Sequence, residues 1–203
     1  MLKPYYREGT LEAGCDEAGR GCIAGPVFAA AVIISPGRTH PALDDSKRLS
    51  ATKRQELRAW IEGEAMLWAV ASVNEKEIDE INILNASFLA MHRALEQLKH
   101  IPAHILVDGN RFKPYGTVPH TCMVRGDAIF ASIAAASILA KTHRDEHMRA
   151  LHQKFPAYGW NRNKGYPTRA HREAILTYGP APHHRRSFRL LNNQTRLDLF
   201  ETD

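Results

Sequence analysis

The order of the apolar segments along the chain limits the fold most strongly. Three runs with strand-like composition come early, at residues 11–15, 27–34 and 65–73. Two more, at residues 105–110 and 117–124, alternate with helical patterns in the second half of the chain. Strands that alternate with helices are typical of proteins in which helices cover a central sheet. We therefore expect an α/β fold with a mixed sheet, in which the first two strands are antiparallel neighbours.

Four helices are expected, over residues 50–63, 75–99, 129–155 and 168–178. Ser50 can cap the first of them and Gly63 can end it. The second places apolar side chains three and four residues apart, and Asn82 and Asn85 can break it into two helices. The third is alanine-rich and apolar on nearly all sides in its first half, so we expect it to pack closely against the sheet.

Two adjacent acids, Asp16 and Glu17, follow the first strand-like run and precede a glycine-rich segment, residues 19–21 (GRG). Neighbouring side chains of an extended strand point to opposite faces. Two acids that share a metal ion therefore require a bend at this point, which glycine makes easy. Bare backbone N–H groups beside an acidic pocket suit a hard divalent cation and a phosphate-bearing substrate.

Further acids follow other apolar strands, each beside a glycine: Asp108 precedes Gly109, and Asp127 follows Gly126. A buried carboxylate without a partner is strongly disfavoured, and a bound cation offsets this cost. Four acids around two divalent ions, about 4 Å apart, form the arrangement that hydrolyses phosphodiesters. One ion orients the nucleophile, and the other stabilises the leaving 3′ oxygen.

Positive charge is concentrated at the end of the chain. Residues 141–203 hold 12 Lys and Arg against 6 Asp and Glu, whereas residues 1–140 hold 15 against 16. A basic region beside an acidic pocket suggests a polyanion whose backbone lies on the basic part, although a solvated basic face would look the same. The chain has no membrane-span pattern and no signal-peptide pattern, so we expect a cytoplasmic protein. Its three cysteines, Cys15, Cys22 and Cys122, are expected to be reduced thiols.

Several motifs, taken in order, resemble bacterial ribonuclease HII (type 2 ribonuclease H) along nearly the whole chain. They are CDEAGRGCIAGPV (15–27), DDSKRLS (44–50), INILNAS (81–87), VDGN (107–110), GD (126–127) with SIAAASILAKTHRD (132–145), NKGYPT (163–168) and HRRSF (184–188). The resemblance implies a single ribonuclease H-like catalytic domain over residues 1–203, with a five-stranded mixed sheet between helices. Residues 156–203 would be its helical, basic, substrate-binding part.

The resemblance also implies an activity. An enzyme of this family hydrolyses the RNA strand of RNA–DNA hybrids and uses Mg2+ or Mn2+ as its cofactor. The family also cuts 5′ to single ribonucleotides in duplex DNA, leaving 3′-hydroxyl and 5′-phosphate ends. Roles in ribonucleotide removal and primer RNA removal, and so in DNA repair and replication, would follow.

The site residues that the resemblance implies fall into two groups. The ligands of two metal ions would be Asp16, Glu17, Asp108 and Asp127. The substrate-binding residues would be Gly19, Arg20 and Gly21, which sense the ribose 2′-hydroxyl, Tyr166 at the RNA–DNA junction, and Lys47, Lys141 and Arg144 as phosphate contacts. Proton transfer by His143, His171 or His184 is a weaker alternative to phosphate contact or a surface position.

Three features depart from this pattern or add to it. Cys22 stands where the family usually has proline, and Asn163 where it often has histidine, which affects turn stiffness and substrate grip rather than the reaction. Residues 194–200 (QTRLDLF) resemble peptides that bind the replication sliding clamp, although these apolar side chains can also pack on their own domain.

Two other functions fit parts of the pattern. One is a structure-specific, metal-dependent DNase on the same fold, which gives no reason for the GRG segment or Tyr166. The other is a non-catalytic RNA–DNA hybrid-binding module, which predicts the loss of at least one of the four acids. None of the four is missing.

Overall fold

The computed structural model describes residues 2–35, 37–43 and 49–191. Its strands are β1 (Glu12–Ala18), β2 (Val27–Ile33), β3 (Leu67–Val73), β4 (His104–Asp108) and β5 (His120–Met123). Its helices are α1 (Ala51–Glu64), α2 (Glu75–Gln97), α3 (Ala131–Lys154), α4 (Trp160–Asn163) and α5 (Arg169–Tyr178). Two 3-10 turns, η1 (Gly126–Ala128) and η2 (Pro156–Tyr158), precede and follow α3. The expected α/β architecture is confirmed.

The five strands form one mixed sheet in the order β3-β2-β1-β4-β5. The β1–β2 and β2–β3 pairs are antiparallel, and the β1–β4 and β4–β5 pairs are parallel. The expected antiparallel pairing of the first two strands is therefore confirmed. Cys15 of β1 is opposite Val107 of β4, so the next residues along each strand, Asp16 and Asp108, lie at the same level of the sheet.

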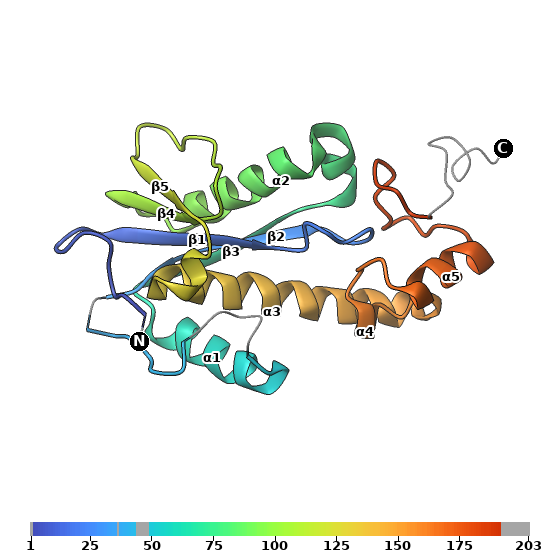
Figure 1. The fold of residues 1–203 in the computed structure, drawn as a ribbon, viewed down its shortest axis with the longest axis horizontal. Coiled ribbons are helices and arrows are strands. Elements are labelled where there is room, and N and C mark those ends of the chain that lie inside the picture. The colour runs from blue at the N-terminus through green and yellow to red at the C-terminus, as the bar shows by residue number, and fades with distance from the viewer. Residues whose placement is uncertain (1, 36, 44–48, 192–203) are drawn as a thin grey trace.

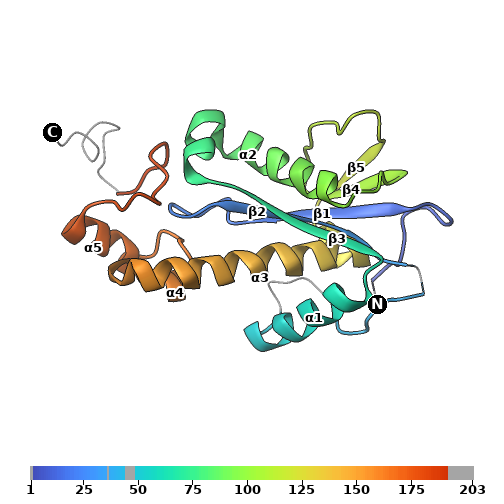
Figure 2. The same ribbon diagram turned by 180° about the vertical axis from the view of Figure 1, so that it is seen from behind.

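Helices cover both faces of this sheet. In Figure 1, α2 lies on one face, and α3 with α1 lies on the other, and Figure 2 shows the same layers from behind. The alanine-rich half of α3 is buried along its whole length, as its small apolar residues predict. A Cβ atom on Gly14 of β1 would lie 2.3 Å from the Ser132 carbonyl carbon. Glycine thus lets α3 lie directly against the strand that carries the acids.

Side chains at the helix ends explain the helix boundaries. Ser50 caps α1, because its Oγ accepts a hydrogen bond from the Lys53 N–H at 3.1 Å. Asn74 caps α2 in a capping box with Glu77. Asn82 interrupts α2 with φ +65°, so the predicted break occurs at the first of the two asparagines. The Asn82 Oδ1 caps the second part of the helix by accepting from the Leu84 and Asn85 N–H groups.

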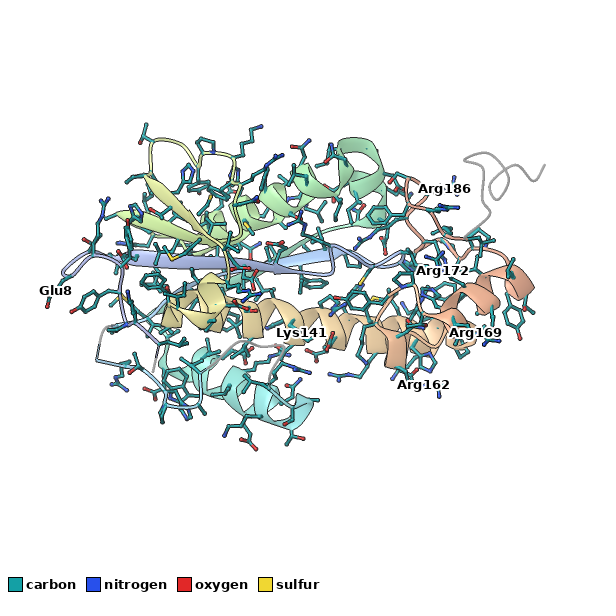
Figure 3. All side chains as sticks on the ribbon, viewed as in Figure 1. Glu8, Lys141, Arg162, Arg169, Arg172 and Arg186 are labelled. Carbon is teal, nitrogen blue, oxygen red and sulfur yellow. The ribbon has the colours of Figure 1, made fainter. Side chains whose placement is uncertain are left out.

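The segment after α3 lies beyond one end of the sheet (Figure 1). It packs through a cluster around Trp160, which is fully buried, against Ile23 and Ala24 of the link between β1 and β2. Figure 3 shows four arginines spread over this part, Arg162, Arg169, Arg172 and Arg186. No helix in the described ranges is both long enough and apolar enough to cross a membrane.

Candidate active site

The acidic pair lies within a regular strand. β1 continues through Asp16 and Glu17 to Ala18, and these acids are opposite Ala30 and Ala29 of β2. The bend expected between the two acids is therefore wrong, because the β2 pairing keeps the strand extended. The turn comes two residues later, at Gly19, whose φ of +100° favours glycine.

The two carboxylates consequently leave opposite faces of the sheet. Asp16 points toward α3, where the Ser137 side chain hydrogen-bonds to it. Glu17 borders a second hollow, on the α2 side, with Ser87 and Phe88. The two hollows share Glu17, Arg20 and Asp108, so they meet where β4 ends beside β1. Because β4 ends at Asp108, the acids on the two faces of the sheet border one continuous region.

The first hollow, called here the acidic cleft, collects most of the predicted site. It is lined by Asp16, Glu17, Ala18, Gly19, Arg20, Gly21, Asp108, Ser137, Lys141, Arg144 and Tyr166. These residues come from β1, the following turn, β4, α3 and the segment before α5. Three of the four predicted metal ligands and six of the seven predicted substrate-binding residues are therefore in one place; Lys47 lies outside the described residues.

Burial and mutual repulsion raise the pKa values of the two β1 acids. Asp16 is 6% exposed. Its pKa lies well above the usual range, mainly because of burial and then because of the charges on Glu17 and Asp108. Burial also raises the pKa of Glu17, and the Arg20 guanidinium, 3.0 Å from its carboxylate, opposes this. Hard oxygen donors that repel one another fit a divalent cation, whose charge would relieve the repulsion.

One hydrogen bond holds Asp108 against Gly126, the residue before Asp127. Asp108 Oδ1 accepts from the Gly126 N–H at 2.7 Å, and Asp127 follows in η1. Asp127 is 1% exposed, and it is not among the residues that line the acidic cleft. Within residues 2–35, 37–43 and 49–191, no three His, Cys, Asp or Glu side chains already form a metal-binding group. The four-ligand assignment thus stays a prediction.

The GRG turn (residues 19–21) lies against the ring of Tyr166. A Cβ atom on Gly21 would lie 3.7 Å from Cε1 of Tyr166. The Tyr166 side chain is 41% exposed, so one part of its ring faces the cleft region and remains available to a ligand. Two elements that are 145 residues apart in the sequence therefore form one surface beside the acids.

The two basic residues of α3 differ in accessibility. The Lys141 ammonium lies 3.7 Å from Asp145, and burial lowers its pKa. Arg144 is only 1% exposed. Its Nη1 donates to the Lys164 carbonyl at 3.3 Å, and its guanidinium lies 5.2 Å from the Tyr166 ring centre. The phosphate contact predicted for Arg144 stays a prediction, while its observed contacts support the segment that carries Tyr166.

None of the three histidines considered for proton transfer lines the acidic cleft. His143 contacts Glu62 at 3.1 Å on the α1 side of the molecule. His171 and His184 are buried, with their Nε2 atoms 3.1 Å apart. Their positions favour a structural role over proton transfer to or from a substrate.

Sequence reasoning missed two residues near this site. Ser137 lies in the apolar half of α3, and a lone hydroxyl facing the sheet was the signal that could have identified it. Arg185 belongs to the HRRSF motif, and it is fully buried under the GRG turn. A buried arginine cannot be told from a surface arginine by sequence pattern alone.

A family model described as Ribonuclease HII matches residues 13–191. The chain belongs to the ribonuclease HII family. A ribonuclease HII of Parabacteroides distasonis is 60% identical over 197 residues, which cover 97% of this chain and 99% of the relative. The family consists of type 2 ribonucleases H, so the chain is an enzyme that acts as an endonuclease on RNA–DNA hybrids.

Solved structures of two relatives agree with the fold. The ribonuclease HII in the PCNA:RNase HII complex from Archaeoglobus fulgidus has a TM-score of 0.72 and 26% identity, over 86% of this chain and 92% of that chain. Ribonuclease H2 from Pyrococcus horikoshii OT3 has a TM-score of 0.71 and 28% identity, over 88% of this chain and 94% of that chain. The ribonuclease H-like fold is therefore confirmed.

Proposed function

We propose that this ribonuclease HII cuts duplex DNA on the 5′ side of a single embedded ribonucleotide, leaving 3′-hydroxyl and 5′-phosphate ends. The observation that carries the proposal is that the GRG turn and the Tyr166 ring lie together beside the acids, so close that a Cβ atom on Gly21 would be 3.7 Å from the ring. A long hybrid can be recognised by its overall shape. Recognition of one ribonucleotide requires groups that contact one sugar.

The GRG turn is suited to that contact. A 2′-hydroxyl both donates and accepts hydrogen bonds, so backbone amides can recognise it. Glycine at positions 19 and 21 lets the sugar approach the main chain, because a larger side chain would hold the duplex away. The partly exposed Tyr166 ring can then pack against the nucleotide at the RNA–DNA junction.

The residues of the acidic cleft fit the Mg2+ or Mn2+ that the proposal requires. Asp16, Glu17 and Asp108 would hold the ions, and Asp127 would complete the set from η1. Two divalent ions, when bound, would supply the charge that activates water and stabilises the leaving 3′ oxygen. Lys141 lines the same cleft, where its ammonium can neutralise the charge of the substrate phosphate.

The basic part after α3 would hold the backbone of the duplex. Four arginines are spread over it, Arg162, Arg169, Arg172 and Arg186 (Figure 3). Contacts of this kind carry affinity without sequence preference and weaken as salt rises. The enzyme would thus remove ribonucleotides and RNA primers at any sequence, as DNA repair and replication require.

The deciding experiment compares three labelled duplexes: one with a single ribonucleotide, one all-DNA and one RNA–DNA hybrid. Each is incubated with the enzyme in Mg2+, in Mn2+ and in EDTA. We expect one cut, 5′ to the single ribonucleotide, in either metal and none in EDTA. Cleavage of the all-DNA duplex would favour a structure-specific DNase instead. Binding without cleavage in either metal would favour a hybrid-binding module.

We also propose that residues 194–200 bind the replication sliding clamp. Leu197, Leu199 and Phe200 are apolar, and they lie outside the described residues. The Archaeoglobus relative is solved in a complex with PCNA, which supports a partner of this class. Deleting residues 194–203 should lower the affinity for the bacterial clamp, measured by surface plasmon resonance, at least about tenfold. Cleavage of the single-ribonucleotide duplex should be unchanged. Unchanged clamp affinity, with a known clamp peptide competing normally, would contradict this proposal.

A further inference from the structure

Arg185 is fully buried, and its guanidinium is bound to the main chain of the GRG region. Its Nη2 donates to the Gly19 carbonyl at 2.8 Å, and its Nη1 donates to the Arg20 carbonyl at 3.0 Å. Its Nε donates to the Gly25 carbonyl at 2.9 Å. One side chain from the C-terminal part therefore binds three carbonyls of the loop that follows β1.

These bonds fix the direction of two peptide N–H groups. In a trans peptide, the carbonyl and the following N–H point in opposite directions, and the described chain has no cis peptide bond. The Gly19 and Arg20 carbonyls point toward Arg185. The N–H groups of Arg20 and Gly21 therefore point away from it. No group in the described part of the chain accepts a hydrogen bond from either N–H, and both residues line the acidic cleft.

His184, the residue before Arg185, supports the Tyr166 backbone through His171. His184 and His171 contact each other through their Nε2 atoms at 3.1 Å, and His171 Nδ1 contacts the Tyr166 carbonyl at 2.9 Å. The Trp160 N–H donates to His171 Nε2 at 3.0 Å. With a hydrogen on His171 Nδ1 and on His184 Nε2, both rings are neutral, and the one lone pair of His171 Nε2 is shared by the Trp160 and His184 donors. Adjacent residues thus anchor the GRG turn and the Tyr166 backbone.

A guanidinium suits this place better than an ammonium does. Its donors form a rigid planar fork that can span three carbonyls, whereas an ammonium is a compact point charge. Burial lowers the pKa of Arg185 to about 10, so the side chain is still charged at neutral pH. The guanidinium also lies 5.0 Å from the Phe188 ring centre, but no carboxylate among the described residues offsets its charge through a hydrogen bond, so its burial costs desolvation. Packing alone does not require a buried arginine at this position. The order that its hydrogen bonds give to the GRG turn explains its presence.

We propose that Arg185 is a positioning residue that orients the Arg20 and Gly21 N–H groups toward the ribose 2′-hydroxyl, while His184 keeps Tyr166 in register with them. The inference rests on the proposed recognition of single ribonucleotides and adds the residues that set it. It assigns to the C-terminal part a role in selecting the sugar, besides binding the duplex backbone.

The test is Arg185→Lys, which keeps the charge and removes the fork. We expect kcat/KM on the single-ribonucleotide duplex to fall about 10- to 100-fold, because small displacements of binding groups have effects of this size. The Kd for the all-DNA duplex should change less than about twofold, since it does not involve the 2′-hydroxyl. Arg38→Lys is the matched control, because that side chain is 64% exposed on the link between β2 and α1, and it should leave both values unchanged.

Thermal unfolding shows whether each variant is folded. His184→Gln, a milder change that leaves the Arg185 fork in place, should lower kcat/KM several-fold with the same unchanged Kd; it is decisive if Arg185→Lys does not fold. Wild-type kcat/KM in a folded variant would overturn the inference, as would equal losses in kcat/KM and in all-DNA affinity. Failure of the wild-type enzyme to cut at a ribonucleotide would instead refute the proposed function.

Discussion

The Asp16→Asn variant should lose about 1000-fold or more in kcat and yet unfold at a higher temperature than the wild type in metal-free buffer. Activity falls because the neutral amide is a poor ligand for the ions that drive hydrolysis. Stability rises because burial, and then the charges of Glu17 and Asp108, raise the pKa of Asp16 and so disfavour its charged form in the folded protein. Removing one charge from such a group relieves the repulsion in the folded state.

The same variant separates a metal site from a merely buried acid. Adding Mg2+ or Mn2+ should raise the wild-type melting temperature, because a ligand that binds only the folded state stabilises it. This rise should be much smaller in Asp16→Asn and in Asp108→Asn. Glu96→Gln removes one exposed charge from α2 and should behave as the wild type does. If Asp16→Asn kept more than a tenth of the activity, the acids would not be the metal ligands.

The sequence carried enough information for the location of the acids, since apolar strands followed by an acid and a glycine are local patterns. The sequence did not predict that β1 stays extended through Asp16 and Glu17. The bend expected there assumed that both acids must share one face. In the structure, β2 pairs along the whole of β1, and the early end of β4 at Asp108 makes both faces accessible. That outcome depends on the lengths of neighbouring strands, which local patterns do not set.

Contacts between distant segments were also beyond the sequence patterns. The segment around residues 184–185 is placed by the packing of Trp160 and its neighbours against Ile23 and Ala24. This packing, together with the backbone bridge between Ala24 and His184, brings Arg185 within 2.8 Å of the Gly19 carbonyl. Positive charge in the last third of the chain predicted phosphate contacts, yet the most buried arginines there, Arg144 and Arg185, bind carbonyls of their own chain. Composition counts charges but does not distinguish exposed arginines from structural ones.

The wild-type enzyme should lose stability between pH 6.5 and pH 4 through His184. Burial lowers the pKa of this imidazole from an ordinary 6.5 to about 4, and the neighbouring His171 acts in the same direction. Above pH 6.5 the ring is neutral in both states, so its contribution is fully present. As the pH falls, the unfolded chain binds a proton that the folded chain does not bind until about pH 4. Linkage gives a loss of about 3 kcal/mol across this range.

The His184→Gln variant isolates this contribution, because glutamine does not titrate. The raised pKa values of Asp16 and Glu17 act in the opposite direction, but they are common to both proteins. Urea unfolding at several pH values should show the variant less stable than the wild type at pH 7, with the difference shrinking by about 2–3 kcal/mol at pH 4.5. A constant difference across this range would mean that His184 gains its proton as easily in the folded protein as in the unfolded chain. The neutral His171–His184 pair could then not be the support of the Tyr166 backbone.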